Sequence, residues 1–155
     1  MAESRLDRFF IMPASPKKTR IAAIVEKLEG RELDAHYLGY FECFNQQLYY
    51  EAHEVLEQIW LPQRGGPDGA FYKGLIQLAG AFVHIEKARL GPAKVLFGLA
   101  EENLRNYPSV HQFLDLNAVI SVIHVWRGKI ESATAQAAVL LGSTPPEIKL
   151  LGIEL

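Results

Sequence analysis

Segments with a helical repeat of apolar residues, separated by breaks rich in glycine and proline, are the feature that most constrains how this chain can fold. The clearest repeat lies at residues 48–59, where five apolar side chains share one stripe at about 100° per residue. They are Leu48, Ala52, Val55, Leu56 and Ile59. The following stretch, Leu61–Gly69, has two prolines and three glycines and cannot continue a helix. Each stripe needs a partner to cover it, so the pattern predicts helices packed on one another.

The breaks leave helices expected near residues 19–28, 34–45, 47–60, 70–89, 92–106 and 117–130. Asp34 and Asp68 are good N-cap residues for two of them. We therefore predict an all-α, single-domain helical bundle of about five main helices. We expect an N-terminal arm with a short helix at 1–30, the bundle at 31–135, and a C-terminal tail at 136–155. Four apolar tail residues are expected to pack on the bundle: Ile148, Leu150, Leu151 and Ile153.

Composition limits the class of protein. A chain of 155 residues has the length of one ordinary domain, and 49% hydrophobic with 22% charged residues is typical of a soluble globular protein. The net charge of −2, with basic residues spread along the chain, argues against nucleic acid as a partner. No run approaches the roughly 20 apolar residues of a membrane span, and the apolar run at the N-terminus is too short for a signal peptide. Cys43, without a second cysteine, is expected to be a buried thiol. We expect a cytoplasmic protein.

Two polar side chains stand at the edge of the 48–59 apolar stripe. His53 and Glu57 are one helical turn apart at this boundary, where a side chain is half buried. Glu51, Glu54 and Gln58 are expected on the opposite, solvent-facing side.

The helix expected at 70–89 carries a matching polar line. This line contains Lys73, Gln77, Gly80, His84 and Lys87. Glycine inside a helix costs roughly 0.5–1 kcal/mol relative to alanine. Gly74 and Gly80 therefore indicate a close approach by another backbone or a ligand, and the helix that bears His53 is the simplest candidate for it.

Antiparallel packing of these two helices would bring His53, Glu57, Gln77 and His84 into one pocket, with Lys73 near its rim. Two imidazoles and one carboxylate can bind Zn, Fe or Mn with open positions, which makes His53, Glu57 and His84 a candidate metal site. Without a metal, the carboxylates and the ammonium could perform acid–base chemistry, and hydrolysis is one such reaction. On that hypothesis Glu54, Glu57 and Lys73 are catalytic, while Trp60 and Gln77 contact a small-molecule ligand.

Two other interpretations stay open. The polar cluster can be a structural hydrogen-bond network that fixes helix register and has no ligand. In that case the chain is an interaction or assembly module, and a homodimer could form through a surface around Val119, Ile123 and Trp126. The sequence does not decide whether the protein is an enzyme. His111 is expected in an exposed connection.

No segment of this chain, taken alone, matches a known catalytic or metal-binding motif well. His53-Glu54-Val55-Leu56-Glu57 has Glu57 where a zinc peptidase has its second histidine. Tyr50 stands where a di-iron bundle has the glutamate three residues before the histidine. Phosphate-binding glycine loops and the usual serine or cysteine nucleophile motifs are not found.

Taken together, the motifs are more specific. Phe44-Asn45, the run from Tyr50 to Trp60, the run from Phe71 to Ala79, and His84 resemble domain-of-unknown-function family 309 over about residues 37–130. The resemblance implies a small helical bundle, found mainly in bacteria, archaea and plastid lineages, without an established activity. Carried onto this chain, it implies functional roles for His53, Glu54, Glu57, Trp60, Lys73, Gln77 and His84. The family usually has glutamine where this chain has Lys73, and residues 1–30 and those from about 132 lie outside the resemblance.

Overall fold

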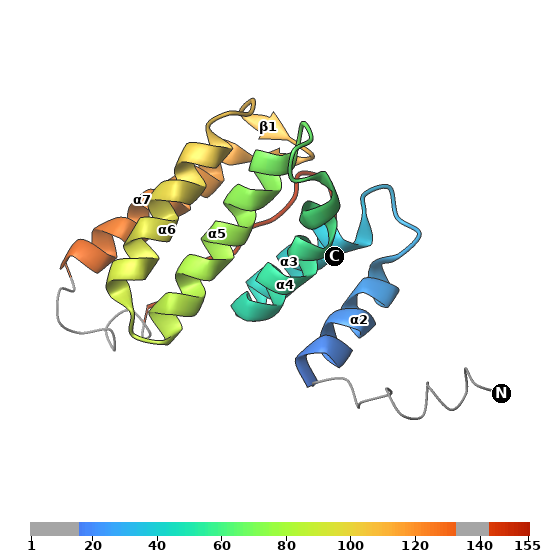
Figure 1. Cartoon of the computed structure of the whole chain (residues 1–155), viewed down its shortest axis with the longest axis horizontal. Coiled ribbons are helices and arrows are strands. Elements are labelled where there is room, and N and C mark those ends of the chain that lie inside the picture. Colours follow the sequence, from blue (N-terminus) through green and yellow to red (C-terminus); the bar gives the residue numbers. More distant parts are fainter. Residues whose placement is uncertain (1–15, 133–142) are drawn as a thin grey trace.

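The computed structural model describes residues 16–132 and 143–155 (Figure 1). Within these residues the chain is a bundle of six α-helices with one short 3-10 turn and one two-stranded hairpin. The helices are α2 (Pro16–Leu28), α3 (Ala35–Asn45), α4 (Tyr49–Trp60), α5 (Gly69–Glu86), α6 (Leu90–Leu104) and α7 (Leu116–Ser132). The 3-10 turn is η1 (Leu61–Gln63), and the strands are β1 (Val110–His111) and β2 (Leu114–Asp115). The predicted all-α class is confirmed.

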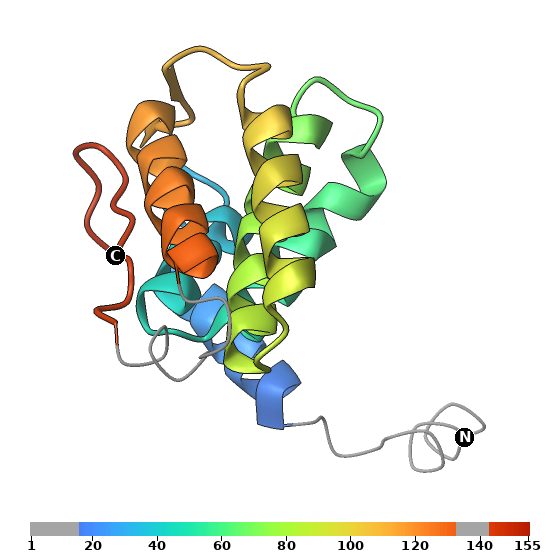
Figure 2. The ribbon, with the colours of Figure 1, turned by 90° about the vertical axis from the view of Figure 1, so that its left-hand side faces the viewer.

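Helix α5 lies in the middle of the molecule. Helices α6 and α7 cover one side of it, and α3 and α4 cover the other (Figure 1). The view turned by 90° shows α7 beside α6 (Figure 2). Tyr49 at the start of α4 stacks on Phe82 near the end of α5, with ring centroids 4.9 Å apart. The other ends of these helices are joined through η1, so α4 and α5 are antiparallel, as predicted.

An aromatic cluster on α3 anchors the core. Tyr37, Tyr40, Phe41 and Phe44 are all fully buried. The hydroxyl of Tyr40 donates to the backbone oxygen of Leu75 at 2.6 Å, which ties α3 to α5. Cys43 is also buried, as predicted, and burial raises the pKa of its thiol to about 12. The thiol is therefore protonated at neutral pH.

The expected cap residues behave differently from each other. Asp34 caps α3, because its Oδ1 accepts from the backbone N–H of His36 at 2.7 Å. Asp68 precedes α5 but makes no capping hydrogen bond with its side chain. Helix α5 ends at Glu86 and not at Arg89. Ala88 is left-handed (φ 58°), and the N–H groups of Ala88 and Arg89 bond back to Ile85 and His84, which is a Schellman ending.

Asp68 instead holds the β1–β2 hairpin, which the sequence did not predict. Its two carboxylate oxygens lie 2.8 Å from Nε2 of His111 and 2.9 Å from Nε2 of Gln112. His111 also packs on the rings of Phe71 and Tyr107. The expectation of an exposed His111 is therefore wrong: the residue is half buried, because the tight turn at 112–113 folds it back onto α5.

The glycines of α5 face a different neighbour from the one expected. A Cβ at Gly74 would lie 2.9 Å from the side chain of Leu104 and 3.2 Å from the backbone oxygen of Ala100. At Gly80, the contact is Leu96 at 3.3 Å. All three of these neighbours belong to α6. The two glycines therefore allow close packing of α6 on α5, and not of the helix that bears His53.

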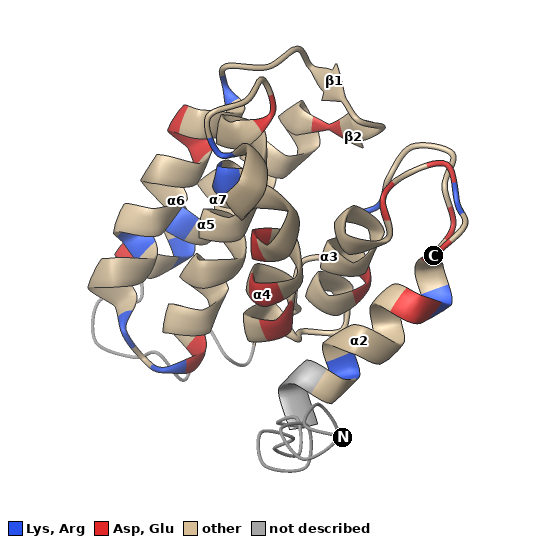
Figure 3. Ribbon diagram, turned by 45° about the vertical axis from the view of Figure 1, so that its right-hand side comes forward, with Lys and Arg blue, Asp and Glu red and all other residues tan. Residues whose placement is uncertain are grey.

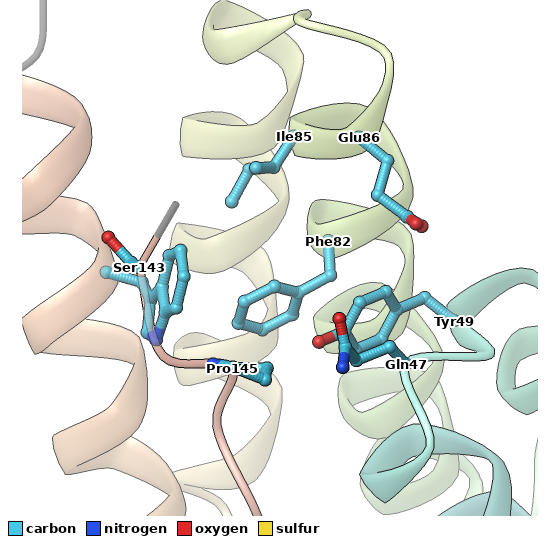
Figure 4. A pocket seen from close by; sticks show the side chains of 8 residues that line it. Gln47, Tyr49, Phe82, Ile85, Glu86, Ser143 and Pro145 are labelled. Atoms are coloured by element: carbon cyan, nitrogen blue, oxygen red, sulfur yellow. The ribbon is translucent and has the colours of Figure 1, made fainter. Parts of the chain in front are cut away.

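The C-terminal segment packs on the bundle, as expected. The amide of Asn45 makes two hydrogen bonds of 2.8 Å with the backbone N–H and oxygen of Ile148. Ile148 and Leu150 are buried, whereas Leu151 is 47% exposed and does not join the core. Ser143 and Pro145 close a small cavity of about 60 Å³ over Phe82 and Tyr49 (Figure 4). The parts of the predicted arm at 1–15 and of the tail at 136–142 lie outside the described residues.

The surface around α7 proposed for a homodimer is not exposed. Val119, Ile123 and Trp126 are 1%, 0% and 5% exposed, because they pack into the core of this same chain. In the part of the chain that the structure describes, no helix is long and apolar enough to span a membrane.

Candidate functional site: a groove between helices α4 and α5

A groove of about 310 Å³ runs along the outer side of the α4–α5 pair. Its walls are mostly apolar, and its polar groups come from both helices. The lining residues are Tyr50, His53, Ile76, Gln77, Gly80, Val83, His84, Lys87 and Leu96. The volume is at the lower end of the range for small-molecule sites in proteins. The groove therefore brings together three of the residues predicted from sequence: His53, Gln77 and His84.

His53 stands between two carboxylates of its own helix. Its Nε2 lies 3.2 Å from Oε2 of Glu57, one turn along α4. Its Nδ1 is buried and makes no hydrogen bond with any described residue, although Oε1 of Glu54 is 3.5 Å away. A protonated His53 would thus have a carboxylate oxygen near each ring nitrogen. The carboxylate of Glu54 also raises the pKa of the neighbouring Tyr50, which stays a neutral phenol.

His84 faces the same groove from α5 and has no partner among the described residues. Its Nδ1 is buried without a hydrogen bond. Its Nε2 is not among the buried unpartnered atoms, so this nitrogen is accessible to solvent, on a residue that lines the groove. Partial burial, together with the cations Arg89 and Lys87, lowers the pKa of His84. At neutral pH the ring is therefore uncharged and can donate or accept one hydrogen bond at the groove.

Gln77 is oriented by α6. The amide of Asn103 donates to Oε1 of Gln77 at 2.7 Å. This bond fixes the carbonyl end of the Gln77 side chain, so its Nε2 donors are turned away from Asn103. Gln77 is thus a positioned polar group in the wall of the groove.

The other predicted site residues lie outside the groove lining. Glu57 reaches the site through its contact with His53. Glu54 lines a different, broader hollow between α2 and α4. Lys73 is exposed on α5 and Trp60 packs against the core, and neither lines the groove. The indole N–H of Trp60 is buried and has no hydrogen-bond partner in the part of the chain that the structure describes.

A candidate cation site lies beside the groove. Among the described residues, His53, Glu54 and Glu57 each place one potential ligand atom within 4.8 Å of the others. His84, which the sequence suggested as a third ligand, is not in this group. The 3.2 Å between Nε2 of His53 and Oε2 of Glu57 suits two neighbouring ligands at about 2.0–2.2 Å from one ion.

Several important residues could not be assigned from the helical repeats. Leu96 reaches the groove from α6, and no local pattern predicts which helix would supply this wall. Glu51 was expected on the solvent face but is 4% exposed, because α2 covers it and Arg20 lies 3.6 Å from its carboxylate. Tyr50 could have been predicted as a groove residue, because it precedes His53 by three residues and so lies on the same face of the helix.

The fold and the groove define the class: a small helical bundle whose central antiparallel pair carries a lateral, mainly apolar groove with two histidines. Residues 37–96 match the model of the family described as Domain of unknown function (DUF309), so the family resemblance is confirmed over this segment. The segment runs from α3 to the first part of α6 and includes all nine residues that line the groove, the last of which, Leu96, is at its end. No curated protein and no solved structure matches the chain.

Proposed function

We propose that the α4–α5 groove binds a small organic molecule, with His53 and His84 at its polar positions and Ile76, Val83 and Leu96 against its apolar part. The observation that carries this proposal is His84, which faces the groove without any hydrogen-bond partner among the described residues. A purely structural network would bond such a ring to other protein groups, and no described residue bonds to it. A ligand in the groove would bond to Nε2, because Nδ1 is buried and out of its reach.

A reaction at this site would use His53 as its acid–base group. Glu57 at 3.2 Å is placed to stabilise the imidazolium that forms when His53 accepts a proton. Hydrolysis of a bound ligand is one reaction that such a base supports. Lys73, exposed on α5, has no part in this proposal.

Gly80 offers a direct test of groove binding. A leucine at this position would extend into the groove, because Gly80 lines it and its Cβ would meet only the side-chain end of Leu96. Gly98→Leu, where no atom lies within 4 Å of the added Cβ, is the matched control. We expect fragments that bind the wild-type protein in a ligand-observed NMR screen to bind Gly98→Leu and to be lost from Gly80→Leu. Fragments that bind all three proteins equally would refute the groove as the site.

A divalent metal at His53, Glu54 and Glu57 is a second candidate function, favoured by the close approach of their donor atoms. Metal analysis of protein purified without a histidine tag tests it. Stoichiometric Zn, Fe or Mn that is lost in His53→Ala and kept in His84→Ala would support this set of ligands. Substoichiometric metal that neither change affects would exclude it.

A further inference from the structure

We infer that the ligand of the groove is a small organic anion with an apolar tail, whose charged head lies at the His84–Lys87 end. This inference rests on the proposed ligand-binding function and adds the chemical class of the ligand. The described residues that line the groove include two histidines and Lys87, and none of them is Asp or Glu.

The cations at this end form no ion pair within the described residues. Lys94 and Arg105 each pair with a glutamate there, whereas Lys87 and Arg89 do not. Glu86, the nearest acidic residue in the sequence, lines the small cavity on the Tyr49 side of α5 (Figure 4). The three glutamates of α4 lie along the neighbouring helix (Figure 3). Lys87 and Arg89 lie in the turn between the end of α5 at Glu86 and the start of α6 at Leu90. An anion at this end would therefore meet two cations that form no ion pair with the described residues.

His84 adds a directional contact. Its Nε2 is accessible to solvent, and the ring lines the groove. Burial and then the nearby cations Arg89 and Lys87 lower its pKa, so the local potential includes a positive contribution. A carboxylate head can accept a hydrogen bond from the neutral ring and pair with the Lys87 ammonium. Beyond the head, Val83, Gly80 and Leu96 offer an apolar path toward Ile76. Such a path suits an alkyl or aryl tail.

Three probes with one tail and different heads test the inference by isothermal titration calorimetry: octanoate, 1-octanol and octyltrimethylammonium. We expect octanoate to bind at least tenfold more tightly than 1-octanol, and the cation to bind most weakly. Reversing the charge in Lys87→Glu is expected to weaken the binding of octanoate at least tenfold and to change the affinity for 1-octanol by less than about twofold. The matched control is Lys149→Glu, since Lys149 is 78% exposed and lies in the C-terminal segment.

The outcomes separate this inference from the proposed function. Binding of 1-octanol as tight as that of octanoate, blocked by Gly80→Leu, would overturn the anionic class and keep the groove as a ligand site. Octanoate binding unchanged in Lys87→Glu would also overturn the anionic class. Failure of all three probes to bind would count against the inference and the proposed function together.

Discussion

Nε2 of His53 lies 3.2 Å from Oε2 of Glu57, one turn further along α4, at the edge of a groove whose opposite wall carries His84. Glu57 reaches the groove only through this contact. A substitution of Glu57 therefore acts on the orientation and charge of His53. We expect Glu57→Gln to keep the fold and to move the NMR signals of the His53 ring, because the charged partner at its Nε2 is lost. His53 ring signals that stay unchanged in Glu57→Gln at constant pH would argue against the pairing.

The pH dependence of stability should report on His84. Its pKa is lowered in the folded protein, so as pH falls below the unfolded value of about 6.5 the unfolded chain takes up the proton first. Stability is therefore retained above that pH and falls on acidification. In urea denaturation, we expect a smaller loss between pH 7 and pH 5.5 in His84→Gln than in the wild type. A variant with the same or a steeper loss would contradict the lowered pKa.

Asp68 should stabilise the protein through the hairpin and not through a helix cap. Asp68→Ala removes the acceptor of His111 and Gln112, and we expect it to cost about 1–3 kcal/mol in free energy of unfolding. Asp68→Ser separates the two roles, because serine is as good an N-cap as aspartate but is too short to replace both contacts. We expect serine to be nearly as destabilising as alanine. Full rescue by serine would show that capping is the important role.

Gly74 and Gly98 form a matched pair of helix glycines. Alanine at Gly74 would press on the buried Leu104 and on the α6 backbone, so we expect a cost of roughly 1–3 kcal/mol from overpacking. Alanine at Gly98 meets no atom within 4 Å and should stabilise the protein by about 0.5–1 kcal/mol. Thermal unfolding of both variants measures the difference. Equal effects of the two substitutions would contradict the tight α5–α6 contact.

The C-terminal segment should depend on one amide. Asn45→Ala breaks both hydrogen bonds to the Ile148 backbone, and we expect a loss of about 1–3 kcal/mol together with faster amide exchange at Ile148. Gln46→Ala is the control. Among the described residues, the Gln46 side chain bonds to the side chain of Glu42 on the surface, so its loss should change stability by less than about 0.5 kcal/mol. Slow exchange at Ile148 in Asn45→Ala would mean that apolar packing alone holds the segment.

The sequence predicted well what depends on local periodicity. The apolar stripes predicted the helices and allowed the antiparallel packing of α4 and α5. The polar residues at the stripe edges predicted that His53, Gln77 and His84 line one pocket. It failed where a distant segment decides the outcome. Glu51 is buried because α2 covers it. Gly74 packs closely against α6, and Asp68 contacts His111 because the β1–β2 turn places that histidine beside it. Val119, Ile123 and Trp126 look like an unpartnered surface in sequence but pack within the chain.

The histidines provide the most direct measurement of the central claim, that His53 and His84 share one ligand site. The protein is labelled with ¹³C at the histidine rings and titrated with a fragment that binds the wild type. We expect the ring signals of His53 and His84 to shift together, with those of His36, His111 and His124 unchanged, and we expect no shifts in Gly80→Leu. A fragment that binds without moving either His53 or His84, or that moves His111 instead, would contradict the account.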